Sequence, residues 1–555
     1  MIRLKARCVL ILACAASLAV PDARGGDSRI VSWNAYSRQF IDPPVFGLLA
    51  LPGVAAYRAS MESGGARWTV ESRTPRLDLA PVWSRVPVKK FKLTLQWLDG
   101  RGHVLAEETS ERVKAPDWQG FHEPAADWVG AADRNIAWLV RVAVSGRAPY
   151  REPGVPVWIW SAASPCPVPT PASLGPGYTI KDYREYFEYR ARIWPDGHGE
   201  GYPGCIVPAI ISAMLAHAGA GRPQHDAALR LARAAADWAL GNRLPDSGAL
   251  PLFPYTTIAR GKFFGGVESK SVNLLRASWI GLALVRLYEA TSDARYLEYA
   301  RHIARVTKRF QAPDGSFPYR IDPRTGEVTE AFCTGGIQFS LLVEALVPHG
   351  VEPDLMMASE RAVQWMTAYP AQTSHWQGGY EDIAEAKPYQ NLTHWEAQLL
   401  LQYLCQHKDD DPTYLPLATK LLRFVEDQFT LFGPESEAHP VPVKGPLVFE
   451  QFACWWPMEC HTGYYIQSLL ALHRATGEKA YLEKAMAAAN AICAQQFADG
   501  SISNWGTRWL ENGQPRGENC GHTWYNTNAV AAASLYQLDA YLHGAAAAGA
   551  PEKKR

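Results

Sequence analysis

Hydrophobic and polar positions follow two different periods, one near the N-terminus and another through most of the chain. From about residue 28 to 118, apolar and polar residues alternate, as in RWTVES (67–72) and FKLTLQW (91–97). The segment LDGRGH (98–103) has the composition of a hairpin turn. Alternation with a period of two is typical of half-buried strands. We therefore expect residues 28–120 to form a small β-sandwich of the fibronectin or immunoglobulin type.

Between residues 178 and 543 the period becomes helical, and helices of two kinds alternate. NLLRASWIGLALVRLY (273–288) is apolar nearly all round, which predicts burial on every side. YLEYARHIARVTKRF (296–310) has a single apolar face and is amphipathic. Pairs of a buried helix and a half-exposed helix recur about six times along this region. The pattern predicts a mainly α fold, an (α/α)6 toroid with six inner helices inside six outer helices.

One repeat within this region can be aligned residue by residue. EATSDARYLEYARHIARVTKRFQAPDGS (289–316) corresponds to RATGEKAYLEKAMAAANAICAQQFADGS (474–501), and weaker copies lie between and before them. Regular self-similarity of this kind indicates a repeated supersecondary unit. The DGS segments at 314–316 and 499–501 follow the amphipathic helix of each copy. We therefore expect DGS to form the connection from an outer helix to the next inner helix.

The remaining boundaries follow changes in composition. Residues 121–177 contain a helical stretch and then a proline-dense connector, since clustered prolines disfavour helix. Residues 1–23 have a basic start and a short apolar run, typical of a signal peptide, with Cys14 as an alternative lipid-attachment site. An exported protein, periplasmic or secreted, is expected, and no later stretch is apolar and long enough to span a membrane. The tail 544–555 is expected to be disordered.

Composition narrows the choice of partners. The formal net charge of +0 argues against nucleic acid, which requires a basic surface. Ten cysteines without C-x-x-C spacing argue against a disulfide framework. The chain holds 20 Trp and 24 Tyr, many of them in glycine-rich loops. Flat aromatic rings with polar groups around them suit sugar rings, so a polysaccharide or oligosaccharide is the expected partner.

The repeats resemble those of the six-hairpin (α/α)6 enzymes that act on carbohydrates. The resemblance is carried by YEATSDARYLEYA (288–300), HRATGEKAYLEKA (473–485) and the two DGS segments, and it covers roughly residues 180–540. That superfamily includes glycoside hydrolases, polysaccharide lyases and sugar epimerases, some with a β-sandwich before the toroid. The resemblance therefore implies the fold and a substrate cleft at one mouth of the ring, where long loops enter the inner helices. It does not select one reaction.

Four polar residues occupy equivalent positions at the start of successive inner helices, namely Arg276, Thr334, His394 and His461. A core position would be apolar each time, so polar residues at this level predict a solvent-lined cavity. Helix N-termini favour anionic groups, and arginines bind carboxylate or sulfate through bidentate bonds. The arginines available at this mouth are Arg276, Arg508 and Arg516. Helix capping or packing by the same side chains is the alternative interpretation.

Hydrolysis of a glycosidic bond requires two carboxyl groups, one protonated and one ionised. Glu396 and Glu459 are the preferred pair, because each lies next to one of the two histidines and near tryptophans. Hydrolysis of an acidic or decorated saccharide by this pair is the favoured function. Other carboxylates expected in the mouth loops are Asp196, Glu200, Glu268, Glu381, Asp382, Glu511 and Glu518.

β-Elimination on a uronate, the reaction of a polysaccharide lyase, is the alternative. A base removes the proton next to the carboxyl group and an acid protonates the leaving oxygen. The expected groups for these roles are His394, His461, His522, Tyr464, Tyr465, Tyr525, Asn526 and Arg508. A non-catalytic glycan-binding protein is a third interpretation. In all three cases the residues expected to bind substrate are Arg276, Trp395, Trp455, Trp456, Arg508, His522, Trp524, Tyr525 and Asn526.

No cofactor is expected, and zinc is weighed as an alternative. Glu459-Cys460-His461 and the segment 518–522 bring carboxylate, thiol and imidazole groups into neighbouring loops. Zinc accepts these ligands. A disulfide from Cys520 to Cys454 or Cys460 competes with a metal site, as do free thiols.

Overall fold

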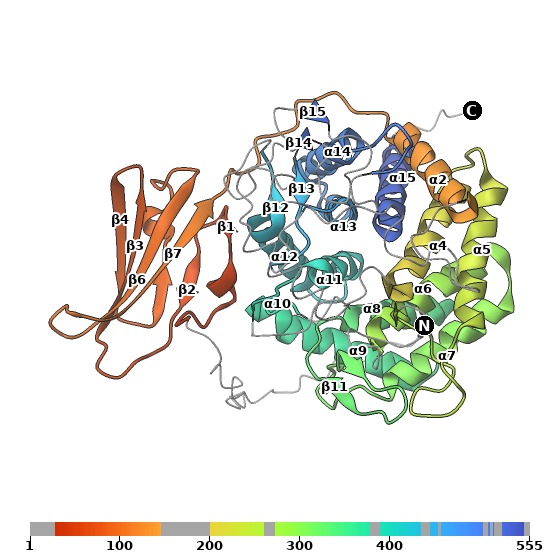
Figure 1. The fold of residues 1–555 in the computed structure, drawn as a ribbon, viewed down its shortest axis with the longest axis horizontal. Coiled ribbons are helices and arrows are strands. Elements are labelled where there is room, and N and C mark those ends of the chain that lie inside the picture. Colours follow the sequence, from red (N-terminus) through yellow and green to blue (C-terminus); the bar gives the residue numbers. More distant parts are fainter. Residues whose placement is uncertain are drawn as a thin grey trace.

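The structure is a computed structural model with a β domain beside a ring of helices (Figure 1). The expected signal peptide and most of the proline-dense connector lie outside the described residues. The structure describes residues 28–145, 200–259, 272–377, 389–433, 445–452, 457–502, 509–510, 514–515 and 524–548. Within these ranges no helix is both long enough and apolar enough to cross a membrane.

The β domain contains the alternating segments. Its five-stranded sheet has the order β1-β7-β6-β3-β4, and a two-stranded sheet of β2 and β5 shares its core. Phe46 of β2, Leu77 of β5 and Leu93 of β6 are all fully buried in this core. The described residues thus contain a five-stranded and a two-stranded sheet that share one core, which agrees only in part with the expected β-sandwich. The elements are β1 (Gln39–Phe40), β2 (Val45–Gly47), β3 (Ala56–Ser63), β4 (Ala66–Ser72), β5 (Arg76–Asp78), α1 (Ala80–Trp83), β6 (Lys90–Leu98) and β7 (Val104–Lys114).

Twelve helices in the described part form six pairs around a ring. The inner helices are α4 (Pro203–Gly219), α6 (Leu274–Thr291), α8 (Gly336–Leu346), α11 (Trp395–Gln406), α13 (Glu459–Thr476) and α15 (Tyr525–Ala548). The outer helices are α5 (His225–Gly241), α7 (Ala294–Lys308), α9 (Pro353–Ala368), α12 (Tyr414–Phe429), α14 (Lys479–Ala494) and α2 (Trp128–Ser145). This arrangement is the (α/α)6 toroid expected from the sequence.

Short elements occupy the connections between the helix pairs. They are β8 (Glu200–Gly201), β9 (Ile258–Ala259), β10 (Arg320–Ile321), β11 (Val328–Glu330), α10 (Pro370–Thr373), β12 (Thr430–Leu431), β13 (Leu447–Val448), β14 (Trp509–Leu510) and β15 (Gln514–Pro515). The pairs are β8–β9, β10–β11, β12–β13 and β14–β15, all antiparallel. They lie on the segments that lead into inner helices.

The ring is closed by a helix that the sequence analysis assigned to the connector. α2 packs against α15, α4, α5 and α14, so it is the outer partner of α15 (Figure 1). Asp133 of α2 accepts hydrogen bonds from Arg222 Nε, at 3.1 and 3.2 Å, and from Tyr536 Oη, at 2.6 Å. Asn490 of α14 accepts from Ala126 N at 2.9 Å and Trp128 Nε1 at 2.8 Å. The helical domain therefore includes residues well before the expected boundary at 178.

The two DGS loops connect an outer helix to the next inner helix, as expected, and they make matching hydrogen bonds. Gln311 Nε2 donates to Gly315 O and to Ala358 O of α9. The equivalent Gln496 donates to Gly500 O and to Ala131 O of α2. α2 therefore stands in the same relation to its DGS loop as α9 does to the other. The sequence repeat is a repeat of this packing.

The glycine of each DGS loop is required by its close approach to the next outer helix. Gly315 has φ +98° and Gly500 has φ +95°, a region that L side chains rarely adopt. A Cβ at Gly315 would lie 2.3 Å from Arg361 O, and a Cβ at Gly500 would lie 2.3 Å from Arg134 O. Both loops thus combine a left-handed backbone with direct contact to a helix backbone.

The β domain contacts the ring through α12. Asp427 is 7% exposed, and its Oδ1 accepts from Ile41 N at 2.6 Å and Asp42 N at 2.7 Å. Gln428 Nε2 donates to the other carboxylate oxygen at 2.5 Å. Burial raises the pKa of Asp427 to about 7, although these hydrogen bonds act to lower it. One buried carboxyl group therefore binds the backbone of the β domain to the ring.

Asp427→Asn tests the protonation of this group. Its folded-state pKa of about 7 lies above the ordinary value, so folding takes up a proton and stability is lost as pH rises. We expect the free energy of unfolding of the wild type, relative to Asp427→Asn, to fall from about pH 4 to pH 7 and then to level off. Denaturant titrations across this range measure it, with the exposed Asp409→Asn as control. Parallel profiles for wild type and Asp427→Asn would contradict the assignment.

Gly500→Ala tests the DGS contact. The added Cβ meets the backbone of α2, so we expect the free energy of unfolding to fall by more than about 2 kcal/mol. Gly477→Ala is the matched control, because Gly477 has φ +75° but no atom within 4 Å of its Cβ position. That variant carries only the backbone strain, about 1 kcal/mol. Equal losses in the two variants would show that contact with α2 is unimportant.

Candidate active site

A pocket lies among the N-terminal ends of five inner helices in the described part of the ring: α4, α6, α11, α13 and α15. Its volume is ≈ 670 Å³ including the open mouth, and the centres of water molecules can occupy ≈ 70 Å³ of it. The N-termini of these helices give this end of the ring a positive potential. The lining residues are Tyr202, Cys205, Ala209, Arg276, Trp279, Trp395, Glu450, Met458, Cys460, His461, Tyr464, Trp524, Asn526, Thr527 and Val530.

Arg276 is held by aromatic rings in the first turn of α6. Asn273 caps this helix, since its side chain accepts from Leu275 N at 3.0 Å and Arg276 N at 3.1 Å. The guanidinium carbon of Arg276 lies 4.1 Å from the centre of the Trp395 ring and 5.7 Å from that of Trp279. Arg276 is only 4% exposed. Cation–π contacts of this kind hold a charged group in a nearly dry site.

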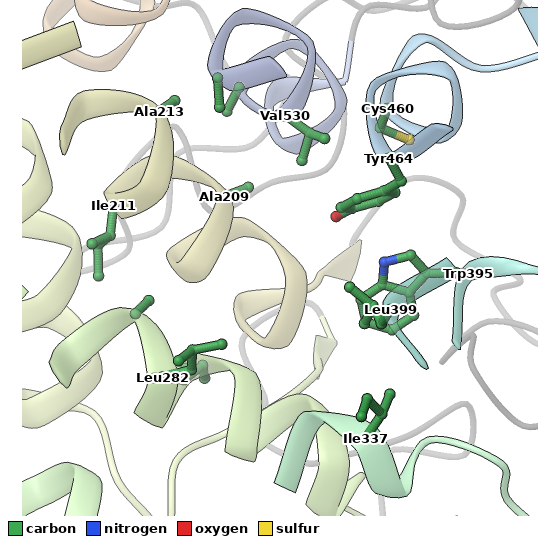
Figure 2. Close-up of a cluster of buried hydrophobic side chains, with 14 of the residues drawn as sticks. Ala209, Ile211, Ala213, Leu282, Ile337, Trp395, Leu399, Cys460, Tyr464 and Val530 are labelled. Atoms are coloured by element: carbon green, nitrogen blue, oxygen red, sulfur yellow. The ribbon is translucent and has the colours of Figure 1, made fainter. Parts of the chain in front are cut away.

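His461 and Tyr464 lie one turn apart on α13, with ring centres 6.3 Å apart. Burial lowers the pKa of His461 well below its usual value, and His394 and Arg276 lower it further. Burial raises the pKa of Tyr464 well above its usual value, and Cys460 adds to this effect. Both groups are therefore neutral at neutral pH. Figure 2 shows Tyr464 and Cys460 projecting from α13 beside Trp395 of α11.

Glu450 is the one carboxylate among the described lining residues, and the sequence analysis did not select it. It is 6% exposed and follows β13 (Leu447–Val448). Its neighbour Phe449 pairs with Pro457 in an isolated bridge, which turns this segment back toward the start of α13. The sequence signal that could have found Glu450 is its place in the aromatic-rich segment FEQFACWWPMECHTGYY (449–465), which leads into α13.

The structure does not bring the expected carboxylate pair into the pocket. Glu396 is fully buried, and its Oε2 accepts from Thr393 Oγ1 at 3.0 Å. Glu459 is 1% exposed, and its Oε1 accepts from Asn528 Nδ2 at 3.4 Å. Burial raises the pKa of Glu459 well above its usual value, with Glu450 as a smaller contribution. Both carboxyl groups lie in the packing between helices, behind the surface of the pocket.

Two of the four equivalent polar positions line the pocket, Arg276 and His461, and two are used in packing. His394 is fully buried, and its Nε2 bonds Phe449 O at 2.6 Å while its Nδ1 bonds Gln398 Nε2 at 2.7 Å. Burial lowers the pKa of His394 to about 3. Thr334 Oγ1 donates to Gln377 O at 2.9 Å. The packing alternative stated from the sequence therefore describes these two residues.

The other expected substrate-binding residues divide into three groups. Trp395, Trp524 and Asn526 line the pocket. Tyr525 is fully buried and donates its hydroxyl hydrogen bond to Leu139 O of α2, so it packs away from the pocket. The lining residues that the sequence analysis missed are Tyr202, Cys205, Ala209, Trp279, Glu450, Met458, Thr527 and Val530. The expected residues outside the described ranges are Trp455, Trp456, Arg508 and His522.

The described part of the chain contains no group of three or more His, Cys, Asp or Glu side chains that could hold a metal ion. Cys205 and Cys460 both line the pocket. The zinc and disulfide alternatives involved Cys454, Cys520 and His522, and all three lie outside the described residues. These alternatives therefore stay predictions.

The chain has the six-hairpin toroid fold. No protein-family model matches it, and no curated protein matches its sequence. Solved structures that resemble it include a family 76 glycoside hydrolase from a bovine Bacteroides thetaiotaomicron strain, with a TM-score of 0.45, 11% identity and coverage of 91% of this chain and 98% of that one.

A D-mannose isomerase matches with a TM-score of 0.48 and 8% identity, over 75% of this chain and 99% of that one. A polysaccharide lyase matches with a TM-score of 0.42 and 12% identity, over 90% of this chain and 64% of that one. The toroid fold that the resemblance implied is confirmed by the arrangement of the helix pairs in the described residues. Likeness at this level does not select a reaction, because one fold carries many chemistries.

Proposed function

We propose that the chain is an enzyme that cleaves a saccharide carrying a carboxylate group, by β-elimination in this pocket. The observation that supports it is the convergence of Arg276, His461 and Tyr464 on one nearly dry site. These three side chains provide a fixed cation, a neutral imidazole and a neutral phenol. Trp279 and Trp524, which are partly exposed, add aromatic faces that suit a sugar ring.

Arg276 binds the substrate carboxylate in this proposal. A guanidinium forms two parallel charge-assisted hydrogen bonds with a carboxylate, and such bonds are stronger where water is excluded. Neutralising the carboxylate makes the proton on the adjacent carbon more acidic, because negative charge that develops there is stabilised. The amide of Asn526 is a further donor at the same pocket.

His461 and Tyr464 transfer the protons. Burial keeps the imidazole of His461 neutral, so it can accept the proton next to the carboxyl group. The electrons of that carbon–hydrogen bond form a carbon–carbon double bond, and the bond to the glycosidic oxygen breaks. Burial keeps the phenol of Tyr464 protonated, so it can donate a proton to the leaving oxygen. The products are an unsaturated sugar and a new reducing end.

Hydrolysis, the function favoured from the sequence, has a different supporting observation. Glu450 lines the pocket and contributes to the raised pKa of Glu459, so the two carboxyl groups interact. Two neighbouring carboxyl groups, one of them with a raised pKa, are the usual acid and base of a glycosidase. Hydrolysis would use Glu450 in place of Glu396. It requires Glu459, which is buried behind the pocket, to reach the substrate.

A panel of uronic-acid and neutral polysaccharides incubated with the purified protein separates these functions. Two signals are recorded, new reducing ends and new near-ultraviolet absorbance. β-Elimination produces both signals, because the product contains a conjugated double bond. Reducing ends without absorbance indicate hydrolysis and contradict the proposal. Binding without either signal indicates the non-catalytic alternative.

Substitutions on α13 test the assigned roles. We expect His461→Ala and Tyr464→Phe each to lower kcat by at least about 100-fold on the uronate substrate. Tyr465→Phe is the matched control, because Tyr465 Oη donates to Glu426 Oε1 at 2.7 Å, away from the pocket. Initial rates and melting temperatures are measured together. Full activity in Tyr464→Phe combined with loss in Glu450→Gln would favour hydrolysis.

The pH profile tests the state of His461. Its lowered pKa means that the neutral imidazole persists below pH 6.5, the ordinary value for histidine. We therefore expect kcat/KM to stay level as pH falls through 6.5 and to decline only at lower pH. Rates from pH 4 to 8 measure this, on protein shown by circular dichroism to stay folded. An acid limb centred at or above pH 6.5 would exclude His461 as the base.

A further inference from the structure

A second and larger cavity lies at the opposite end of the ring. It is formed by the C-terminal halves of α6, α11, α13 and α15, whereas the candidate active site is formed by their N-terminal ends. Water centres can occupy ≈ 730 Å³ of it, compared with ≈ 70 Å³ in the first pocket. The lining residues are Arg286, Gln402, Cys405, Gln406, Lys408, Gln467, Leu470, Ala471, Arg474, Ala475, Gln537, Ala540 and Tyr541.

The charged residues among the described lining residues are all cations: Arg286, Lys408 and Arg474. Lys408 Nζ donates to Asp409 Oδ1 at 2.9 Å, so its charge is already balanced. Neither Arg286 nor Arg474 forms an ion pair with another residue in the described part of the chain. The guanidinium of Arg474 lies 5.2 Å from the centre of the Tyr541 ring. Two guanidinium groups therefore face one cavity without a bound carboxylate.

The helix dipole explains the position of only one of these two arginines. Arg474 lies in the last turn of α13, where a cation stabilises the helix end. Arg286 lies more than a turn before α6 ends at Thr291, so it is not placed there for that purpose. Its side chain is exposed and lines the cavity. Like charges on one cavity repel each other, and an anion between them removes that cost.

The remaining lining residues suit a saccharide. Gln402 Nε2 donates to Ser468 Oγ at 3.2 Å, and Gln467 Nε2 donates to Ser534 Oγ at 3.0 Å. These bonds run from one inner helix to the next and fix both amides at the wall of the cavity. Tyr541 adds a half-buried aromatic ring. Fixed amides and an aromatic face are the groups that bind sugar hydroxyls and C–H surfaces.

We propose that this cavity is a second binding site, for an acidic saccharide whose sulfate or carboxylate groups are held by Arg286 and Arg474. This site is separate from the pocket that contains Arg276, and the saccharide is bound there without being cleaved. The proposal does not depend on the function proposed for that pocket. A site at this end of the ring would hold a charged chain on the face away from the chemistry.

Calorimetric titration of the full chain tests the proposal with three probes. They are a sulfated dextran oligosaccharide, a neutral dextran oligosaccharide of equal length, and sodium sulfate. We expect the sulfated oligosaccharide to bind and the neutral one not to bind. Arg286→Gln/Arg474→Gln should weaken binding by at least about tenfold, since each charge-assisted contact contributes more than a neutral hydrogen bond. Arg230→Gln/Arg233→Gln, on the exposed face of α5, is the control with the same change in net charge.

Each outcome decides a part of the proposal. Unchanged affinity in Arg286→Gln/Arg474→Gln, or equal loss in the α5 control, would overturn the site. If sulfate and the sulfated oligosaccharide bind equally well, the ligand is a free anion, and the proposal of a saccharide ligand is wrong. The same titration in His461→Ala protein separates the two cavities. Binding there should be unchanged, and its loss would place the ligand in the first pocket instead.

Discussion

The toroid depends on the contact between its first and last helices. A ring of helices buries the flanks of every inner helix only if the two ends of the chain segment meet, and α2 and α15 make that contact. The carboxylate of Asp133 joins them, because it accepts from Tyr536 of α15, 403 positions away, and from Arg222 beside α4. Loop closure over such a distance costs only slightly more entropy than over a shorter one. The gain is a continuous core around the ring.

Hydrogen bonds from α2, the helix that closes the ring, continue to the candidate active site. Asn135 of α2 donates to Asn528 Oδ1 at 2.7 Å and to Gly500 O at 2.9 Å. Asn528 in turn donates to Glu459 Oε1 and Ile502 O. Glu459 precedes the lining residues Cys460 and His461, so the network fixes the first turn of α13. This explains why a buried carboxyl group is kept there although it does not itself line the pocket, since each polar atom in such a network positions its neighbours.

Periodicity and repeats were sufficient to predict a ring of paired helices and the DGS connections, because each is a local pattern. The place of α2 in the ring could not be predicted, because its partner α15 is almost the whole chain away. The alignment of the repeats predicted that Arg276, His394 and His461 lie at one level along the ring axis. It did not predict the direction of each side chain. The ring of His394 turns to Phe449 O, a contact from an irregular segment with no period. Glu450 was missed for the same reason.

The two ends of one ring differ in how they attract negative charge. At the N-terminal end the helix dipoles are favourable to anions, and the carboxylate site proposed there needs only a single arginine, which lies against two tryptophans. At the C-terminal end the dipoles oppose an anion, and side chains must supply the whole attraction. Arg286 and Arg474 are placed on different helices at that end. Because the inner helices are parallel, the helix dipoles favour an anion at one mouth and oppose it at the other. Anionic ligands at the two mouths therefore need different sets of side chains.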